Sequence, residues 1–94
     1  MLSQRSPSAG VIAVNSTIGS VMLLSANDAR VGAYFYNNST NFIYIKLGRV
    51  ATTSSFTIML EQGGFYELHE PVYIGRIDGI FSGTGGACQI TELF

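Results

Sequence analysis

Charged residues are scarce in this 94-residue chain, where lysine, arginine, aspartate and glutamate together make up 12% of the sequence. Soluble domains ordinarily contain roughly 25% of these residues. Hydrophobic residues make up 47%, and a chain of this length folds around one small core that leaves much of its surface outside. Much of that surface is therefore neutral or apolar, which favours contact with other proteins over contact with water. The composition predicts an assembly subunit rather than a free-standing enzyme.

The few charges are also scattered singly along the chain. Five basic residues stand against six acidic ones, which gives a formal net charge of −1. No basic stripe is available to follow a phosphate backbone, so we expect no nucleic-acid binding. A net charge this close to zero also weakens repulsion between copies, which suits close packing in an assembly.

Long hydrophobic runs and paired cysteines are missing as well. No purely aliphatic or methionine run is longer than Val21–Leu24, far short of the ~18 residues that a membrane-spanning helix needs. The segment 1–10 holds no apolar stretch of signal-peptide length. Cys88 is the only cysteine, so no internal disulfide forms. These absences favour a protein made in the cytoplasm and not secreted, with no membrane as partner.

Residues that carry catalysis or hold metals are nearly absent. His69 is the only histidine and stands just before Pro71, where a solvated residue at a strand end is the favoured interpretation over a general base. Cys88 with His69 is the one conceivable thiol–imidazole pair, and a lone cysteine is more often a small buried hydrophobe. A zinc site needs about four ligands, and the glycine clusters 63–64 and 83–86 lack the ending of a phosphate-binding loop. We expect no enzyme activity and no cofactor.

Strand patterns, in contrast, recur every eight to twelve residues between turn-forming segments. The sequence predicts an all-β fold of about eight strands, an antiparallel β-sandwich of jelly-roll-like architecture, with a small Greek-key barrel as the alternative. Residues 1–10 are expected to form an extended arm and residues 11–94 the sandwich. The expected strands cover residues 10–14, 17–25, 30–37, 42–47, 55–61, 65–69, 72–82 and 87–93.

Several details of the strands follow from their alternation. The segment 30–37 places Ala33 and Phe35 on one face and tyrosines on the other, and 42–47 is expected to be its antiparallel partner. In 55–61, Phe56, Ile58 and Leu60 fall on one face. The pair Asp78–Gly79 is compatible with a tight hairpin turn, but a strand with a glycine bulge is preferred, because 82–86 supplies a stronger turn directly after it.

Aromatic side chains are concentrated in the middle of the chain. Tyr34, Tyr36, Phe42 and Tyr44 fall in two successive expected strands, where they are compatible with a cross-strand ladder packed on a sheet face. A contact surface for another protein is the functional alternative, because tyrosine combines a large area with a polar tip. A sugar-binding platform is a third interpretation, weakened by the absence of tryptophan.

A string of short segments resembles a family of small virion proteins of tailed bacteriophages. The likeness spans residues 30–93, roughly two thirds of the chain, and lies in residues 30–32, 36–39, 43–48, 53–57, 63–68, 73–80 and 90–93. The resemblance implies a β-sandwich capsid decoration (cement) protein on the virion surface, which bridges major capsid protein subunits and stabilises the shell. It also implies a homotrimer. A small neck or tail component, and a carbohydrate- or receptor-binding module on the same sandwich, remain the alternatives.

The surface through which such a subunit makes its contacts is expected on four parts of the chain. They are the tyrosine face of the third strand, the sixth strand, the N-terminal arm and the C-terminal end. The candidate interface residues are Arg5, Tyr34, Tyr36, Phe65, Tyr66, Leu93 and Phe94. Stable contacts of this kind bury at least about 1,000 Å².

Overall fold

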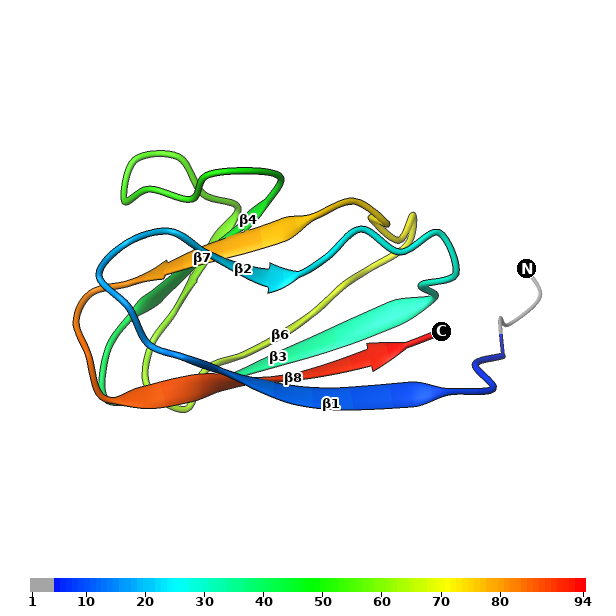
Figure 1. Ribbon diagram of the computed structural model, residues 1–94, viewed down its shortest axis with the longest axis horizontal. Helices are drawn as coiled ribbons and strands as arrows, with labels where there is room; N and C mark the ends of the chain where they lie inside the picture. Colours follow the sequence, from blue (N-terminus) through cyan, green and yellow to red (C-terminus); the bar gives the residue numbers. More distant parts are fainter. Residues whose placement is uncertain (1–4) are drawn as a thin grey trace.

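The computed structural model describes residues 5–94, and these residues form eight β-strands without a helix (Figure 1). Each strand coincides with one of the segments expected from the sequence, so the all-β prediction is confirmed. The strands are β1 (Ala9–Asn15), β2 (Val21–Leu24), β3 (Gly32–Ser39), β4 (Ile43–Leu47), β5 (Ile58–Leu60), β6 (Phe65–Glu67), β7 (Ile77–Phe81) and β8 (Gly86–Leu93).

The strands form two four-stranded antiparallel sheets that pack face to face (Figure 1). Sheet A has the order β1-β8-β3-β6 and sheet B the order β2-β7-β4-β5. The predicted antiparallel β-sandwich is therefore confirmed. The barrel alternative is wrong, because the two sheets remain separate and each keeps two edge strands.

The topology is that of a jelly roll. Strand β1 pairs with β8, β2 with β7, β3 with β6 and β4 with β5. The first half of the chain thus pairs with the second half in reverse order. Consecutive strands lie in opposite sheets, except for β4 and β5, which form a hairpin in sheet B. An eight-stranded double sheet with this order is the jelly-roll solution to the problem of unpaired strand edges.

The expected hairpin between the third and fourth strands is wrong. β3 lies between β8 and β6 in sheet A, whereas β4 lies between β7 and β5 in sheet B. The buried Asn37 amide explains the crossing between the sheets, because its Nδ2 donates hydrogen bonds to the carbonyls of Asn41, Leu60 and Glu61. Its Oδ1 accepts from the Ser39 hydroxyl at 2.6 Å. This network fastens the bend at the end of β3 to the end of β5.

The core lies between the sheets and is built from alternate residues of each strand, as the period-2 pattern predicts. Ala33 and Phe35 of β3 point inward, as do Ile43 and Ile45 of β4, and all four are fully buried. The remaining buried members of the core are Leu23, Leu24, Leu60, Leu68, Ile77, Phe81, Cys88 and Ile90.

The pair Asp78–Gly79 lies inside β7, so the hairpin-turn alternative is wrong and the expected strand is confirmed. The irregularity itself falls on the neighbouring strand, where the register of β2 against β7 shifts between Met22 and Leu24. A Cβ atom at Gly79 would stand 2.7 Å from Leu23 Cδ1. Because glycine has no Cβ, the buried Leu23 side chain can occupy the space next to position 79.

The N-terminal segment joins sheet A earlier than the expected boundary of residue 10. β1 begins at Ala9, and Ser8 exchanges two backbone hydrogen bonds of 2.9 Å with Phe94. Both ends of the described chain consequently lie at the same end of the sandwich (Figure 1). Residues 5–7 precede this pairing and are exposed, and residues 1–4 of the expected arm lie outside the described residues.

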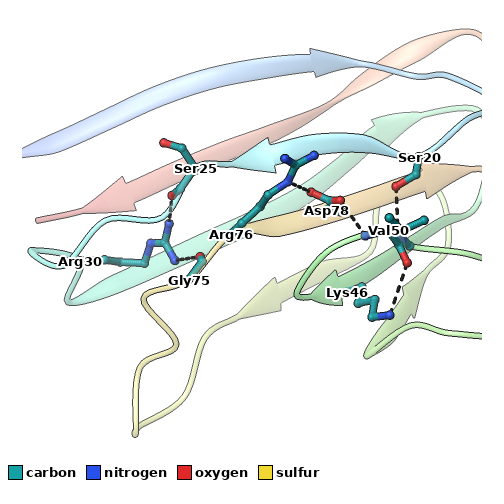
Figure 2. Close-up of polar contacts among 9 residues, drawn as sticks. Ser20, Ser25, Arg30, Lys46, Val50, Gly75, Arg76 and Asp78 are labelled. Atoms are coloured by element: carbon teal, nitrogen blue, oxygen red, sulfur yellow. Dashed lines mark hydrogen bonds and ion pairs between the residues drawn. The ribbon is translucent and has the colours of Figure 1, made fainter.

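The buried Arg30 side chain holds together the loops at one end of the sandwich. Its guanidinium Nε donates to Glu92 Oε2 at 2.7 Å, and its terminal nitrogens donate to the carbonyls of Ser25, Tyr73 and Gly75. Figure 2 shows the contacts with Ser25 and Gly75. A charge taken fully out of water needs such partners, so this arginine belongs to the scaffold and not to the surface.

Candidate interaction surface

The outer side of sheet A, called face A below, is almost free of charge. Neighbouring strands align the side chains in rows, because opposite residues in an antiparallel pair share a face. One row runs Ala13, Gln89, Tyr36 and Phe65, and the next runs Val11, Thr91, Tyr34 and Glu67. Glu67 is the single charged residue among the outward-facing strand positions of this sheet.

Aromatic rings dominate the centre of face A. The rings of Tyr34 and Phe65 stack with centroids 5.9 Å apart and an interplanar angle of 20°. They are diagonal neighbours across β3 and β6, the arrangement that lets large side chains meet on a sheet. Tyr36 is 43% exposed and Phe65 58% exposed. Aromatic side chains that are exposed to water to this extent are typical of a site that contacts another molecule.

A shallow hollow of about 300 Å³ lies among these side chains. Its lining residues carry three aromatic rings, one amide and three hydroxyl groups, and they are Tyr34, Tyr36, Phe65, Gln89 and Thr91. Hydrogen-bonding groups beside exposed rings can receive either an aromatic or aliphatic side chain of a partner protein or a sugar ring.

The outer side of sheet B, called face B below, is a second apolar surface. Ile80, Tyr44 and Met59 form a row across β7, β4 and β5. The Tyr44 ring contacts Phe56 edge to face, with centroids 5.0 Å apart. Phe56 therefore does not join Ile58 and Leu60 on the inner face as expected, because it precedes β5 and its ring turns toward Tyr44.

The loop between β4 and β5 is fastened beside face B by polar contacts (Figure 2). Asp78 is on the outward side of β7 and yet buried, since Val50 N donates to its Oδ2 at 2.9 Å and Arg76 Nε to its Oδ1 at 2.7 Å. Ala51 N donates to Ser20 Oγ at 3.0 Å. Lys46 Nζ reaches the Val50 carbonyl at 3.4 Å. The ion pair and the loop cover Asp78, so this carboxylate adds no charge to face B.

The structure brings together only part of the predicted interface set. Tyr34, Tyr36 and Phe65 meet on face A, and Leu93 lies at the end of the same face, opposite Gly32. Tyr66 points the other way, with its ring stacked on the buried Phe35 at 5.9 Å.

The remaining members of that set lie near the chain ends. Phe94 is half-buried and lies near Gly10, where an added Cβ would stand 3.5 Å from its ring. Arg5 is exposed ahead of β1. Neither residue lines the hollow on face A.

Sequence reasoning missed several residues of these surfaces. Gln89 and Thr91 belong to the hollow, and the alternation of 87–93 carried that signal, because it places both on the side opposite Cys88 and Ile90. The expected ladder of Tyr34, Tyr36, Phe42 and Tyr44 is wrong, because β3 and β4 lie in different sheets. The aromatic residues divide between face A and face B.

The catalytic candidates do not form a site. Cys88 is fully buried on the inner side of β8, and this burial raises the pKa of its thiol to about 12, so the thiolate nucleophile is not formed near neutral pH. His69 is exposed near the end of β6. Among residues 5–94, no cluster of histidine, cysteine and carboxylate side chains could hold a metal ion.

Comparisons with known proteins give no relative. No protein-family model, curated protein sequence or solved structure matches the chain. In the described part of the chain, no helix has the length and apolarity to cross a membrane.

Proposed function

We propose that this protein is a capsid decoration protein that binds the outside of a virus shell and bridges major capsid protein subunits. One observation carries the proposal: both outer faces of the sandwich expose apolar side chains and carry few charges, Glu67 on face A and Lys46 on face B. Face A presents Tyr36 and Phe65, and face B presents Phe56 and Met59, all more than 40% exposed. Two such faces on opposite sides of one domain suit contact with two neighbours at once.

The energetics of the two faces support the same conclusion. Removing apolar surface from water stabilises a contact by about 25 cal/mol per Å², and faces with so few charges avoid most of the cost of stripping water from ions. Each bound copy then stabilises the assembled shell by mass action, since it binds the assembled state and not free subunits.

The fold adds a supporting analogy. Jelly rolls are used widely in viral capsid proteins and in lectins. Because one fold serves many functions, this analogy supports a capsid role and a sugar-binding role equally. The faces, and not the fold, favour the capsid role.

The test is addition of the purified protein to capsids assembled without it, followed by sedimentation and by heating of the loaded particles. We expect saturable binding and a higher temperature of capsid disruption. The double variant Tyr36→Ser, Phe65→Ser should weaken binding at least about 30-fold, because truncation of a buried aromatic anchor costs about 2 kcal/mol or more.

The matched control for this variant is Ile18→Ser. Ile18 is 75% exposed but lies between β1 and β2, outside the strands that form the two faces, so its replacement removes exposed apolar surface without altering the aromatic rings of face A. Absence of binding by the unmodified protein, or equal weakening by the control, would contradict the proposal. If particle imaging places the chain at the neck or tail, that location and not the shell is where the protein binds.

A carbohydrate- or receptor-binding module is the second candidate, favoured by the hollow on face A. Gln89 and Thr91 of β8 stand beside Tyr36 and Tyr34 of β3, which gives an aromatic platform beside hydrogen-bonding groups, as a sugar ring requires. A glycan array with the isolated protein tests this candidate. Binding that disappears in Gln89→Ala, without loss of thermal stability, would favour it over the capsid role.

A further inference from the structure

The free edge of β1 is unusually open for a strand of its length. None of its seven residues is buried, and Val11 is 68% exposed. The sequence of the strand holds neither a charge nor a proline. Charged residues and prolines are what proteins ordinarily use to prevent an edge strand from pairing with another chain.

The hydrogen-bonding groups on that edge can be assigned from the pairing with β8. Ser8 and Phe94 exchange both of their backbone hydrogen bonds, and in an antiparallel ladder such pairs alternate with pairs that exchange none. Residues 10, 12 and 14 therefore bond to β8, whereas Ala9, Val11, Ala13 and Asn15 direct N–H and C=O groups away from the sheet. Within residues 5–94, no strand pairs with this edge and no side chain bonds to it.

The sandwich is also open beside this edge. A cleft of about 280 Å³ separates β1 from β2 and is lined mostly by aliphatic side chains, among them Val14, Met22 and Leu23. Ile12 lines it too and points inward, opposite the buried Ile90. It is nevertheless 45% exposed. At Ile12 the inner face of β1 thus lacks the cover that sheet B gives to the other strands of sheet A, whereas Val14 packs against the core.

We infer that this edge pairs with the β1 edge of a second copy of the chain, antiparallel and about a two-fold axis through Ile12. In this register Ala9 lies opposite Asn15 of the second copy and Val11 opposite Ala13. Every outward-directed N–H and C=O group of the strand then has a partner. The two Ile12 side chains meet at the axis and close the open side of both sandwiches.

A second copy fits better than another strand because the edge is complementary to itself. The pairing residues are symmetric about Ile12, and the strand carries no charge that would repel its own copy. A closed two-fold contact uses the same patch on both partners. A ring of three copies would instead need β1 to pair with a different edge, and the others are short: β5 and β6 have three residues each and β2 has four.

Cysteine substitution tests the register directly. Residues opposite each other without mutual hydrogen bonds have Cα atoms about 4.5 Å apart, within the range of a disulfide. We expect Ile12→Cys to form a covalent dimer under mild oxidation. Val11→Cys is the matched control, because its two copies would stand about 9 Å apart across the axis, too far for a disulfide. The native Cys88 is fully buried and does not take part.

The unmodified protein should have the mass of a dimer by light scattering. Ala13→Pro should raise the concentration at which half of the protein is dimeric at least ten-fold. Proline at this position removes a donor on the free edge only, so the thermal stability measured at high dilution should change little. A monomer, a trimer, or equal cross-linking at positions 11 and 12 would overturn the inference. None of these results bears on capsid binding, which is measured separately.

Discussion

At the scale of single residues, the buried polar groups decide how little charge reaches the surface. Arg30 and Asp78 are buried among their partners, and Asn37 is fully buried. In the described residues, no buried side-chain nitrogen or oxygen lacks a hydrogen-bond partner. Two of the few charged residues, Arg30 and Asp78, are thus buried inside the protein. The outer faces therefore carry less charge than the composition alone indicates.

Arg30→Met should destabilise the protein by about 3–5 kcal/mol, because it leaves Glu92 and several loop carbonyls without their donor. The midpoint of urea unfolding measures this loss. Arg49→Met is the matched control, since Arg49 is exposed, and its effect should stay within about 0.5 kcal/mol. Equal midpoints for the two variants would show that the Arg30 contacts contribute nothing.

Gly79→Ala should cost about 1–3 kcal/mol, since the new Cβ meets a Leu23 side chain that is buried and cannot move aside. Gly19→Ala serves as its control, because no atom lies within 4 Å of the added Cβ. Thermal unfolding of both variants provides the measurement. A Gly79→Ala protein as stable as the Gly19→Ala protein would mean that β2 and β7 do not pack as described.

At the scale of elements, alternation and turn residues predict where strands lie, but the pairing of strands has a different origin. The segments 30–37 and 42–47 follow each other closely and would suit a hairpin by length alone. Their separation into two sheets depends on contacts of Asn37 with Leu60 and Glu61, more than twenty positions later in the sequence. The pattern of neighbouring residues does not indicate partners so far away in the sequence.

The loop between β4 and β5 offers an element-scale prediction. Asp78→Ala removes the acceptor of both Val50 N and Arg76, which should cost about 2–3 kcal/mol and release the loop. Trypsin should then cleave after Arg49 at least ten times faster than in the unmodified protein. Thr53→Ala, an exposed change in the same loop, should leave the rate unchanged. Equal rates for the two variants would indicate that the loop is held by other contacts.

At the scale of the whole molecule, the neutral faces and the open β1 edge describe a domain whose surface is suited to burial. A compact unit of 40 × 21 × 19 Å with a net charge of −1 has little electrostatic repulsion to keep copies apart. We expect its association to depend weakly on salt, because screening acts on charges and the contacts are apolar.

Gln89→Glu should abolish capsid binding while leaving the fold intact, because it places an unpaired charge at the centre of face A. Gln62→Glu adds the same charge in the exposed turn between β5 and β6 and should bind like the unmodified protein. Sedimentation with capsids separates the two, and circular dichroism confirms folding. If both variants bind equally well, face A is not the contact surface.

The sequence by itself determined the number of strands, their approximate limits and the sides of β3 and β4 that enter the core, because these depend on neighbouring residues and a period of two. It also determined the shortage of charge. Only the tertiary structure decided which strands pair, that Tyr66 turns inward while Gln89 joins Tyr34 and Tyr36, and that the β1 edge stays free. Those features arise from contacts between segments far apart in the chain. Such contacts form because the burial of apolar surface offsets the loss of chain entropy, and the pattern of neighbouring residues does not indicate which distant segments will be buried together.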